Sequence, residues 1–360
     1  MRIVVAMSGG VDSSTAAGLL VEQGHEVIGL AMKTHADSSC SSRACCTPDD
    51  MRDARRVADH LRIPFYVLNY EELFLREVIL PFAQAYASGE TPNPCIECND
   101  KVKFRPLLKR ARLLGAQGLA TGHYARIDGP VGARRLLRGV DRHKDQSYFL
   151  YRLTQDQLAM LSFPLGGMHK EEVRAEARRL GLPVAEKRES QEICFVGHEG
   201  YAATVDALAA NATRGGDIVD GEGRVLGRHE GVHHFTIGQR RGLRIAAPEP
   251  LYVTEIDSAR AEVRVGVREE LLHRTVRIGY VQWVRAPEQD AEVELQQRYR
   301  EPARVARIEA LADGELLAHF AQPQPRGAPG QAAVFYRGDE LLGGGTLRPT
   351  ALDAIQRASA

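Results

Sequence analysis

The sequence predicts an α/β protein with a doubly wound parallel sheet, followed by a small central domain and a C-terminal β-barrel. Short apolar runs alternate with segments of helical period over roughly the first third of the chain, as in parallel α/β sheets. After about residue 200, short alternating segments and glycine-rich turns prevail, which is typical of small β-domains. The 360 residues exceed one typical core. We therefore predict domains at 1–200, 201–272 and 273–360.

Composition and charge restrict the class of protein. The chain is 44% hydrophobic and 26% charged, with a formal net charge of zero, as in ordinary globular proteins. No stretch approaches the roughly 20 apolar residues of a membrane span, and the start lacks the features of a signal peptide. We expect a cytoplasmic protein with no membrane partner. With no net charge, any nucleic-acid-binding surface would be a local basic face.

The first βα unit contains a loop suited to an anion. Residues 2–7 predict a buried strand, and residues 15–24 predict a helix closed by Gly24. The loop between them reads Ser-Gly-Gly-Val-Asp-Ser-Ser, residues 8–14. Backbone N–H groups and the positive end of the helix dipole favour an anion there. The two glycines permit close backbone approach, and the serines add hydroxyl donors.

The residues that follow Gly9 and Gly10 indicate which type of nucleotide-binding loop this is. No Gly-Lys-Ser/Thr follows them, which excludes the P-loop of nucleoside triphosphatases. The arrangement instead resembles the PP-loop of ATP pyrophosphatases, an adenine nucleotide alpha hydrolase-like fold that splits ATP into AMP and pyrophosphate. Asp12 beside a phosphate favours an intervening cation, so we expect magnesium with the ATP.

The elements that follow continue the alternation of strands and helices. Residues 51–61 have a helical period that places Met51, Ala54, Val57, Ala58 and Leu61 on one face. The remaining expectations are strands at 26–33, 63–69 and 118–124, helices at 71–88 and 104–114, and loops at 35–50 and 89–99. Ligands of such sheets bind at the carboxyl ends of the strands, so Met32 and Gly122 share a pocket with the PP-loop. The predicted nucleotide site comprises Ala6, Met7, Ser8, Gly9, Gly10, Val11, Asp12, Ser13, Met32 and Gly122.

Beyond residue 200 the signals are those of β-structure. Residues 217–223 have hairpin chemistry. Residues 276–281 and 303–308 predict strands, and the glycine run 343–345 predicts a strand corner or a bulge. These segments are the basis for the predicted barrel.

Six cysteines, at 40, 45, 46, 95, 98 and 194, are candidates for chemistry. Structural disulfides are rare in a reducing cytosol, which leaves catalysis, redox or metal binding. Cys95 and Cys98 form a single C-x-x-C motif, which can be a redox pair, part of a metal site or a chance occurrence. Because there is no second such motif, a tetrahedral zinc site is poorly supported. We expect Cys98 near a helix start, which lowers a thiol pKa, with positive charge from Lys101 and Lys103. A structural role suffices for Cys45 and Cys46, and Cys40 has no assigned role.

Further blocks occur in a fixed order along nearly the whole chain. They are Ala31-Met32-Lys33, Cys45-Cys46, T-P-N-P-x-x-x-C-N, T-G-H-Y, K-D-Q-S-Y-F-L, S-Q-E-I-C-F, F-T-I-G-Q-R-R-G-L and G-Q-A-A-V-F-Y…G-G-G. Together with the PP-loop, these blocks resemble the tRNA-specific 2-thiouridylase family. The resemblance implies ATP-dependent 2-thiolation of the wobble uridine in tRNAs for Lys, Glu and Gln.

The resemblance also implies roles for the cysteines. ATP adenylates the uracil 2-oxo group, so that AMP becomes the leaving group. Cys194 carries a persulfide received from a sulfur-relay protein or a cysteine desulfurase, and Cys98 attacks it, which leaves a Cys98–Cys194 disulfide to be reduced. Such exchange requires thiolate character and access, and we expect both cysteines to be exposed because their segments are polar.

Cys95 leaves a second mechanism open. Some family members carry aspartate at this position, where this chain has a third thiol. Cys95, Cys98 and Cys194 would suit three corners of a 4Fe–4S cluster whose fourth iron binds sulfide. Both routes remain open at this point.

The resemblance implies the tRNA contacts as well. Acting on a base requires extracting it from its stack, and the C-terminal β-domain is expected to bind the anticodon arm by shape and charge. Arg240, Arg241 and Arg300 are further candidates for phosphate contacts. The implied contacts are Asn93, Pro94, Cys95, His123, Lys144, Asp145, Gln146, Arg298, Tyr299 and Gln331.

Two rival functions were weighed against thiolation. Another PP-loop enzyme, such as an amidotransferase-type synthetase or a 4-thiouridine synthase, shares the first loop, but no glutaminase domain is visible. A redox or iron–sulfur carrier would not need the PP-loop or the distant Cys194. Mass spectrometry of tRNA nucleosides separates these functions.

Overall fold

Contacts between residues divide the chain into two units. The computed structural model describes residues 1–34, 48–188, 193–197, 200–209, 214–288 and 291–349. The first unit comprises residues 1–79, 94–198 and 339–341, and the second comprises 80–93, 199–338 and 342–360. The domain boundaries expected at 200 and 272 stay predictions. Cys40, Cys45 and Cys46 lie outside the described residues.

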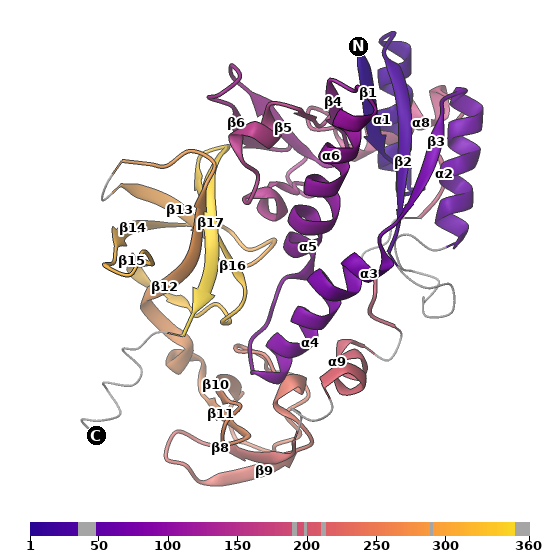
Figure 1. The fold of residues 1–360 in the computed structure, drawn as a ribbon. Helices are drawn as coiled ribbons and strands as arrows, with labels where there is room; N and C mark the ends of the chain where they lie inside the picture. The colour runs from indigo at the N-terminus through magenta and orange to yellow at the C-terminus, as the bar shows by residue number, and fades with distance from the viewer. Residues whose placement is uncertain (35–47, 189–192, 198–199, 210–213, 289–290, 350–360) are drawn as a thin grey trace. The chain divides into compact units, whose positions relative to one another are not determined.

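The first unit is built on a parallel sheet, as the sequence predicts (Figure 1). Its strands are β1 Arg2–Ala6, β2 Glu26–Lys33, β3 Phe65–Asn69, β4 Gly118–Ala120 and β7 Leu161–Ser162. They lie in the order β3-β2-β1-β4-β7, and every pairing is parallel. The order reverses at β1. The carboxyl ends of β1 and β4 therefore flank the position where such sheets bind ligands.

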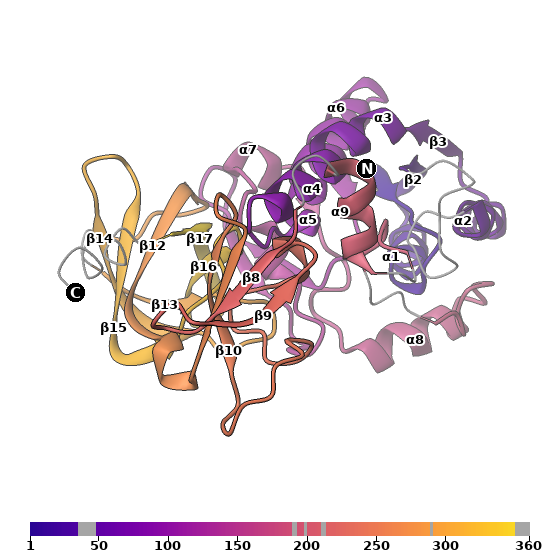
Figure 2. The ribbon, with the colours of Figure 1, turned by 90° about the horizontal axis from the view of Figure 1, so that it is seen from below.

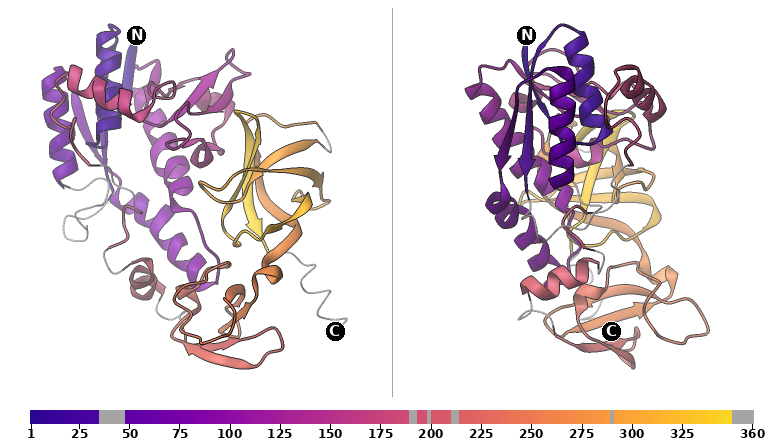
Figure 3. Two further views of the ribbon diagram at one scale, coloured as in Figure 1. Left: turned by 180° about the vertical axis from the view of Figure 1, so that it is seen from behind. Right: turned by 90° about the vertical axis from the view of Figure 1, so that its right-hand side faces the viewer.

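Helices cover both faces of this sheet. Helices α1 Val11–Glu22, α2 Pro48–Leu61 and α8 Lys170–Arg179 pack into one apolar cluster with the strands, and α8 is in front when the unit is seen from behind (Figure 3). Ala54, Val57 and Ala58 are fully buried on the predicted face of α2. Helix α6, Arg105–Leu113, contacts β1 and β4 and lies in front of the sheet in Figure 1.

The helical segments after β3 differ from the prediction. Residues 71–87 form α3 Glu71–Phe74, the π-helix η1 Leu75–Ile79 and α4 Leu80–Ala87. The predicted loop 89–99 is wrong from Pro94 onward, because α5 Pro94–Glu97 and the π-helix η2 Cys98–Phe104 lead without a break into α6. Proline is common in loops, but Pro94 lies at the first position of a helix, where no N–H is needed.

Several short elements of the first unit had no prediction. They are the hairpin β5 Ala125–Asp128 and β6 Arg135–Arg138, the 3-10 helix η3 Ser147–Leu150 and α7 Gln155–Leu158. Strand β6 pairs with Glu340 and Leu341, which belong to the same unit.

In the second unit, a four-stranded sheet follows a helix. The elements are α9 Tyr201–Ala209, β8 Gly216–Val219, β9 Val225–His229, η4 Val232–His234, β10 Tyr252–Asp257 and β11 Glu262–Gly266. The strand order is β10-β11-β8-β9. Strands β8 and β9 are antiparallel, which confirms the predicted hairpin, and Asp220 accepts hydrogen bonds from the backbone of Glu222 and Arg224 in its turn. Helix α9 packs against α4, where the rings of Tyr86 and Tyr201 stack with centroids 4.5 Å apart.

The predicted barrel is present (Figure 2). Its elements are η5 Arg268–Leu271, β12 Leu272–Trp283, β13 Glu292–Gln296, β14 Arg304–Ala310, β15 Leu316–Pro325, β16 Ala332–Arg337 and β17 Glu340–Arg348. The order β12-β15-β14-β13-β16-β17 is closed by pairing of β12 with β17. A side chain at Gly343 or Gly345 would collide with the β12 backbone, so the predicted glycine run permits the closure. Among the described residues, no helix combines the length and apolarity of a membrane span.

Candidate functional site

The loop after β1 is shaped to receive an anion. Gly9 has a φ of 72°, and a Cβ there would overlap the carbonyl oxygen of Asp50, so only glycine fits. Gly10 is the N-cap of α1, and the Ser13 hydroxyl accepts a hydrogen bond from the Ser8 backbone N–H at 3.1 Å. The first N–H groups of α1 have no partner within the helix. These N–H groups and the helix dipole would suit an anion, and the predicted anion site stays a prediction that this geometry allows.

The other predicted nucleotide residues lie at the same edge of the sheet. A Cβ on Gly122, two residues after β4, would lie 2.7 Å from the backbone nitrogen of Ser13. Met7 donates its backbone N–H to Leu30 O at 2.8 Å, and Met32 is the penultimate residue of β2. The structure thus brings Gly122 directly onto the loop, and it places Met32 on the neighbouring strand end.

Asp12 is held by two residues that the sequence analysis did not assign. Its Oδ1 accepts hydrogen bonds from the Tyr124 hydroxyl at 2.8 Å and from Lys170 Nζ at 2.7 Å. Gln146 Oε1 in turn accepts the backbone N–H of Tyr124 at 3.0 Å. Tyr124 belongs to the T-G-H-Y block, which was its only signal. Lys170 is separated from Asp12 by 158 residues, and no local pattern marks it.

A second lysine connects the loop to α2. Lys187 Nζ donates to Gly9 O at 3.1 Å, to Asp50 Oδ1 at 2.7 Å and to Asp53 Oδ2 at 2.5 Å. Burial alone would lower the pKa of Lys187, but the bonds to the two carboxylates outweigh it and the pKa is raised. Lys187 therefore stays charged and fixes the loop against the N-terminal turn of α2.

The donor set at the loop can be tested against magnesium. Sites built on substrate phosphates use one or two carboxylates, and Asp12 supplies one. Its Oδ1 already accepts the Lys170 ammonium. The residues would therefore suit a cation held mainly by phosphate oxygens, with Asp12 as the one protein ligand, and magnesium stays a prediction.

Two of the predicted cysteines pack against the same apolar cluster. Cys98 and Cys194 both pack against the buried group of Phe74, Val78 and Val102. Next to Cys194, the ring of Phe195 lies edge-on to Phe74 with centroids 5.8 Å apart. Cys98 and Cys194 are half-buried, whereas the sequence predicts that both are exposed. Their segments are polar, but both side chains pack against the apolar cluster, which covers part of their surface.

Cys95 occupies a different position on the same helical segment. It is exposed and lies in the first turn after Pro94, whereas Cys98 begins the following π-helix. The helix expected to start near Cys98 therefore starts at Pro94, four residues earlier. Residues three apart in a helix share a face. Cys95 is exposed, whereas Cys98 and Cys194 are half-buried on the apolar cluster, so an iron–sulfur cluster on the three thiols stays a prediction. They are not joined by a disulfide in the structure.

The positive charge expected beside the thiols is partly neutralised. Lys101 Nζ lies 3.0 Å from Glu97 Oε2 and 3.7 Å from Glu77 Oε2. Arg152 donates to Glu97 Oε1 at 2.5 Å. Lys103 donates to Asn99 Oδ1 at 2.8 Å. Glu97, between the two cysteines in sequence, is thus the centre of a local charge network.

The predicted tRNA residues of the first unit differ in their surroundings. The half-buried ring of His123 lies between Phe104 and Phe163, at 5.6 and 5.8 Å between centroids, and this burial lowers its pKa well below the usual value. Asp145 is buried and accepts hydrogen bonds from Arg138, Gly139 and Ser147. Its carboxylate shapes the loop, so a role toward tRNA would be through its neighbours Lys144 and Gln146.

The predicted tRNA residues of the second unit contact other residues of the same unit. Gln331 Nε2 donates to the backbone oxygen of Thr91 at 2.8 Å, two residues before Asn93. Arg298 lies 3.4 Å from Glu301 and is 45% exposed. The Arg300 guanidinium lies over the Tyr299 ring at 5.4 Å. Gln331 therefore supports the segment that contains Asn93.

Three family models match the chain in order. They are described as the tRNA methyl transferase HUP domain over residues 1–198, the tRNA methyl transferase PRC-barrel domain over 208–267, and the Aminomethyltransferase beta-barrel domain over 273–347.

Solved structures give weaker likenesses. An NMN synthetase from Francisella tularensis is 18% identical, with a TM-score of 0.34 over 58% of this chain and 76% of that chain. A 4-thiouridine synthetase in complex with RNA and ATP is 16% identical, with a TM-score of 0.34 over 59% and 51%. At TM-scores below 0.5, these likenesses indicate nothing about activity.

Full-length relatives are much more similar. The tRNA-specific 2-thiouridylase MnmA of Geotalea uraniireducens is 51% identical over 96% of this chain and 94% of its own length. The protein of the same name from Geobacter metallireducens is 52% identical over 96% of both chains, and that of Methylorubrum extorquens is 49% identical over 100% and 96%. The chain therefore belongs to the family of tRNA-specific 2-thiouridylases.

Proposed function

We propose that this chain is an ATP-dependent tRNA-uridine 2-sulfurtransferase that thiolates the wobble uridine of tRNAs for Lys, Glu and Gln. The observation that carries the proposal is the pairing of two sites in one unit. The PP-loop lies at the switch point of the sheet, and Cys98 and Cys194 pack on one cluster of the same unit. The first site activates an oxygen for departure, and the second supplies the sulfur.

The activation step uses the loop and the residues that hold it. The N–H groups at the start of α1 stabilise the charge on the departing pyrophosphate. Asp12 would hold a magnesium ion, which would offset charge on the phosphates, and Lys170 and Tyr124 fix the Asp12 carboxylate. Attack of the uracil 2-oxo group on the α-phosphate breaks the bond to pyrophosphate and leaves an adenylated base.

The sulfur step uses Cys194 and Cys98. A sulfur-relay protein or a cysteine desulfurase supplies a persulfide on Cys194. Attack of the Cys98 thiolate on the inner sulfur forms a Cys98–Cys194 disulfide and releases the outer sulfur as hydrosulfide. Hydrosulfide attacks C2 of the base and AMP leaves. A reductant of the thiol class then restores both thiols.

A second route is supported by the position of Cys95. Cys95 is exposed and lies three residues before Cys98 on one continuous helical segment, so Cys95, Cys98 and Cys194 would supply three thiolate ligands for a 4Fe–4S cluster with one iron open to sulfide. Iron and labile-sulfide assays on anaerobically purified protein decide between the routes. Active protein without iron would exclude the cluster, whereas about four irons and four sulfides per chain would exclude the simple persulfide route.

The tRNA-binding part of the proposal covers both units. Asn93, Pro94, Cys95 and His123 approach the target base; Lys144 and Gln146 lie on the loop that Asp145 shapes; Arg298, Tyr299 and Gln331 serve the anticodon arm. We propose that the enzyme works in the cytoplasm, where its tRNA substrate is.

Mass spectrometry of tRNA nucleosides tests the proposed function. A strain lacking the gene should lose 2-thiouridine, and the wild-type gene should restore it. Cys98→Ser and Cys194→Ser should each fail to restore it because one thiol of the exchange is missing, while Cys40→Ser should restore it. Unchanged 2-thiouridine in the deletion strain would contradict the proposal; loss of 4-thiouridine or of a methylated nucleoside instead would identify a different enzyme.

A further inference from the structure

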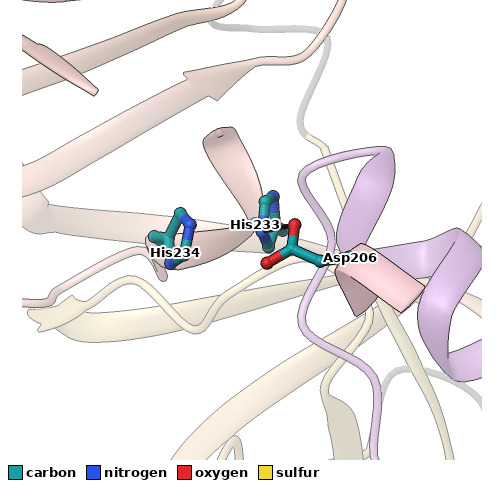
Figure 4. Close-up of side chains that lie close together, drawn as sticks. All are labelled: Asp206, His233 and His234. Atoms are coloured by element: carbon teal, nitrogen blue, oxygen red, sulfur yellow. Dashed lines mark ion pairs between the residues drawn. The ribbon is translucent and has the colours of Figure 1, made fainter. Parts of the chain in front are cut away.

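Three metal-ligating side chains lie close together in the second unit, and the thiolation proposed above uses none of them. Asp206 comes from α9, and His233 and His234 come from η4 (Figure 4). One ligand atom of each residue lies within 4.8 Å of the other two. Across the described residues, this is the one group of three or more His, Cys, Asp or Glu side chains with such spacing.

The chemistry of His233 points to a missing ligand. Its side chain is 1% exposed, yet neither ring nitrogen has a hydrogen-bond partner. Nε2 lies 3.0 Å from Asp206 Oδ1, but the contact lacks hydrogen-bond geometry. Buried polar atoms are normally satisfied, so an orphaned imidazole needs an explanation. A metal ion supplies one, because a neutral imidazole nitrogen binds a metal with its lone pair.

The local backbone is arranged to hold this ring in place. A Cβ on Gly231, the residue before η4, would lie 2.3 Å from His233 Cε1 and 2.5 Å from Nδ1. Only glycine lets the ring fold back over the chain. The rings of His233 and His234 lie with centroids 4.2 Å apart, and the Asp206 carboxylate lies against His233. Side chains of two elements thus lie close together.

We propose that Asp206, His233 and His234 form a zinc site that joins α9 to η4. Two imidazoles and one carboxylate are a common zinc ligand set, with a fourth position for water or another ligand. Tetrahedral ligands at about 2.0–2.2 Å from zinc lie roughly 3.3 Å from each other, close to the 3.0 Å between Asp206 and His233. The site is independent of the thiolation proposed above, since it shares no residue with that reaction.

Zinc content and affinity of the full-length protein test the site. Wild-type protein should bind one more equivalent of Zn²⁺, by calorimetry and by metal analysis after dialysis, than Asp206→Asn, His233→Asn or His234→Gln. The apparent Kd of this equivalent should rise at least about tenfold in each variant. Asp206→Asn is the decisive variant because the Asp206 side chain is 52% exposed and the change keeps its shape.

The control and a spectroscopic readout separate this site from the cysteines. His319 pairs with Glu309 at 2.9 Å on the barrel, so His319→Gln removes a comparable histidine–carboxylate pair and should keep the extra equivalent. Co²⁺ bound at the proposed site should show no thiolate charge-transfer band, unlike Co²⁺ bound to cysteine. Equal zinc binding by wild type and Asp206→Asn, both folded by circular dichroism, would overturn the proposal. Loss of zinc in His319→Gln alone would do the same.

Discussion

Asp12 shows how single residues of the nucleotide site depend on distant partners. A carboxylate beside the phosphates of ATP is unfavourable unless a cation offsets it. The structure provides the Lys170 ammonium at 2.7 Å, with the ammonium also 5.8 Å from the centre of the Tyr124 ring. Sequence reasoning identified Asp12 and its need for a cation. It could not find Lys170 or Lys187, because their contacts span 158 and 178 residues and exist only once the sheet has formed.

Lys170→Met should weaken the use of ATP. The variant keeps the length of the side chain but leaves Asp12 uncompensated near the phosphates. A hydrogen bond to a charged group contributes about 1.5–3 kcal/mol, so KM for ATP should rise about 10- to 100-fold. Pyrophosphate release at varied ATP measures this. Lys109→Met, on the exposed face of α6, is the control, and equal KM values for the two variants would show that Lys170 has no such role.

His123 predicts a pH dependence of stability. Its pKa in the folded protein is below the ordinary value of 6.5, so the unfolded chain takes up a proton that the folded chain does not. Stability is therefore complete above about pH 6.5 and falls as the pH drops below it. Urea midpoints at pH 7.5 and 5.5 should differ less in His123→Phe, which keeps the aromatic packing. His143→Gln, which removes an exposed histidine, should leave the wild-type difference intact.

At the scale of elements, most of the fold could be predicted where the signal is local. The strand–loop–helix at residues 2–22, the buried face of α2 and the hairpin β8–β9 follow from periodicity and turn chemistry. The helix start at Pro94 was missed because proline serves both loops and first helical turns. The π-helix at Cys98–Phe104 could not be predicted from the sequence. Tertiary packing decides whether a helical segment forms i→i+5 hydrogen bonds or the usual i→i+4 bonds, and no residue pattern indicates it.

Gly122 tests whether the end of β4 must touch the nucleotide loop. In Gly122→Ala the new Cβ would meet the backbone of Ser13 and Asp12 at 2.7 and 2.8 Å. Backbone atoms cannot rotate away, so the start of α1 must shift and ATP binding should fall at least tenfold. Gly167→Ala adds the same atom where nothing lies within 4 Å and should bind ATP normally. Isothermal titration with a non-hydrolysable ATP analogue makes the comparison; normal binding by Gly122→Ala would show that the contact is not needed.

For the whole molecule, a formal net charge of zero means that the proposed tRNA binding would depend on local basic side chains. Closure of the barrel could be expected from alternating strands, but the residues of the second unit that would contact tRNA could not be selected, because exposed arginines look alike in sequence. Each phosphate contact adds a released counterion to the binding equilibrium.

Arg298→Gln should therefore weaken tRNA binding in a salt-dependent way. The slope of log K against log salt should decrease in magnitude by about 1 if Arg298 contacts one phosphate. Arg52→Gln is a matched control, because Arg52 pairs with Asp49 at the same spacing as Arg298 with Glu301. Filter binding at several salt concentrations measures both slopes, and identical slopes would remove Arg298 from the interface.

The anchoring of Lys187 at Gly9 also brings the two halves of the proposed reaction close along the chain. Six residues lie between Lys187 and Cys194, and the seven Cα-to-Cα steps reach at most roughly 25 Å when fully extended. Under the proposed function, the thiol that delivers sulfur thus lies within that distance of a residue fixed to the ATP loop. An adenylated uridine formed at this loop would then have its nucleophile within the same unit.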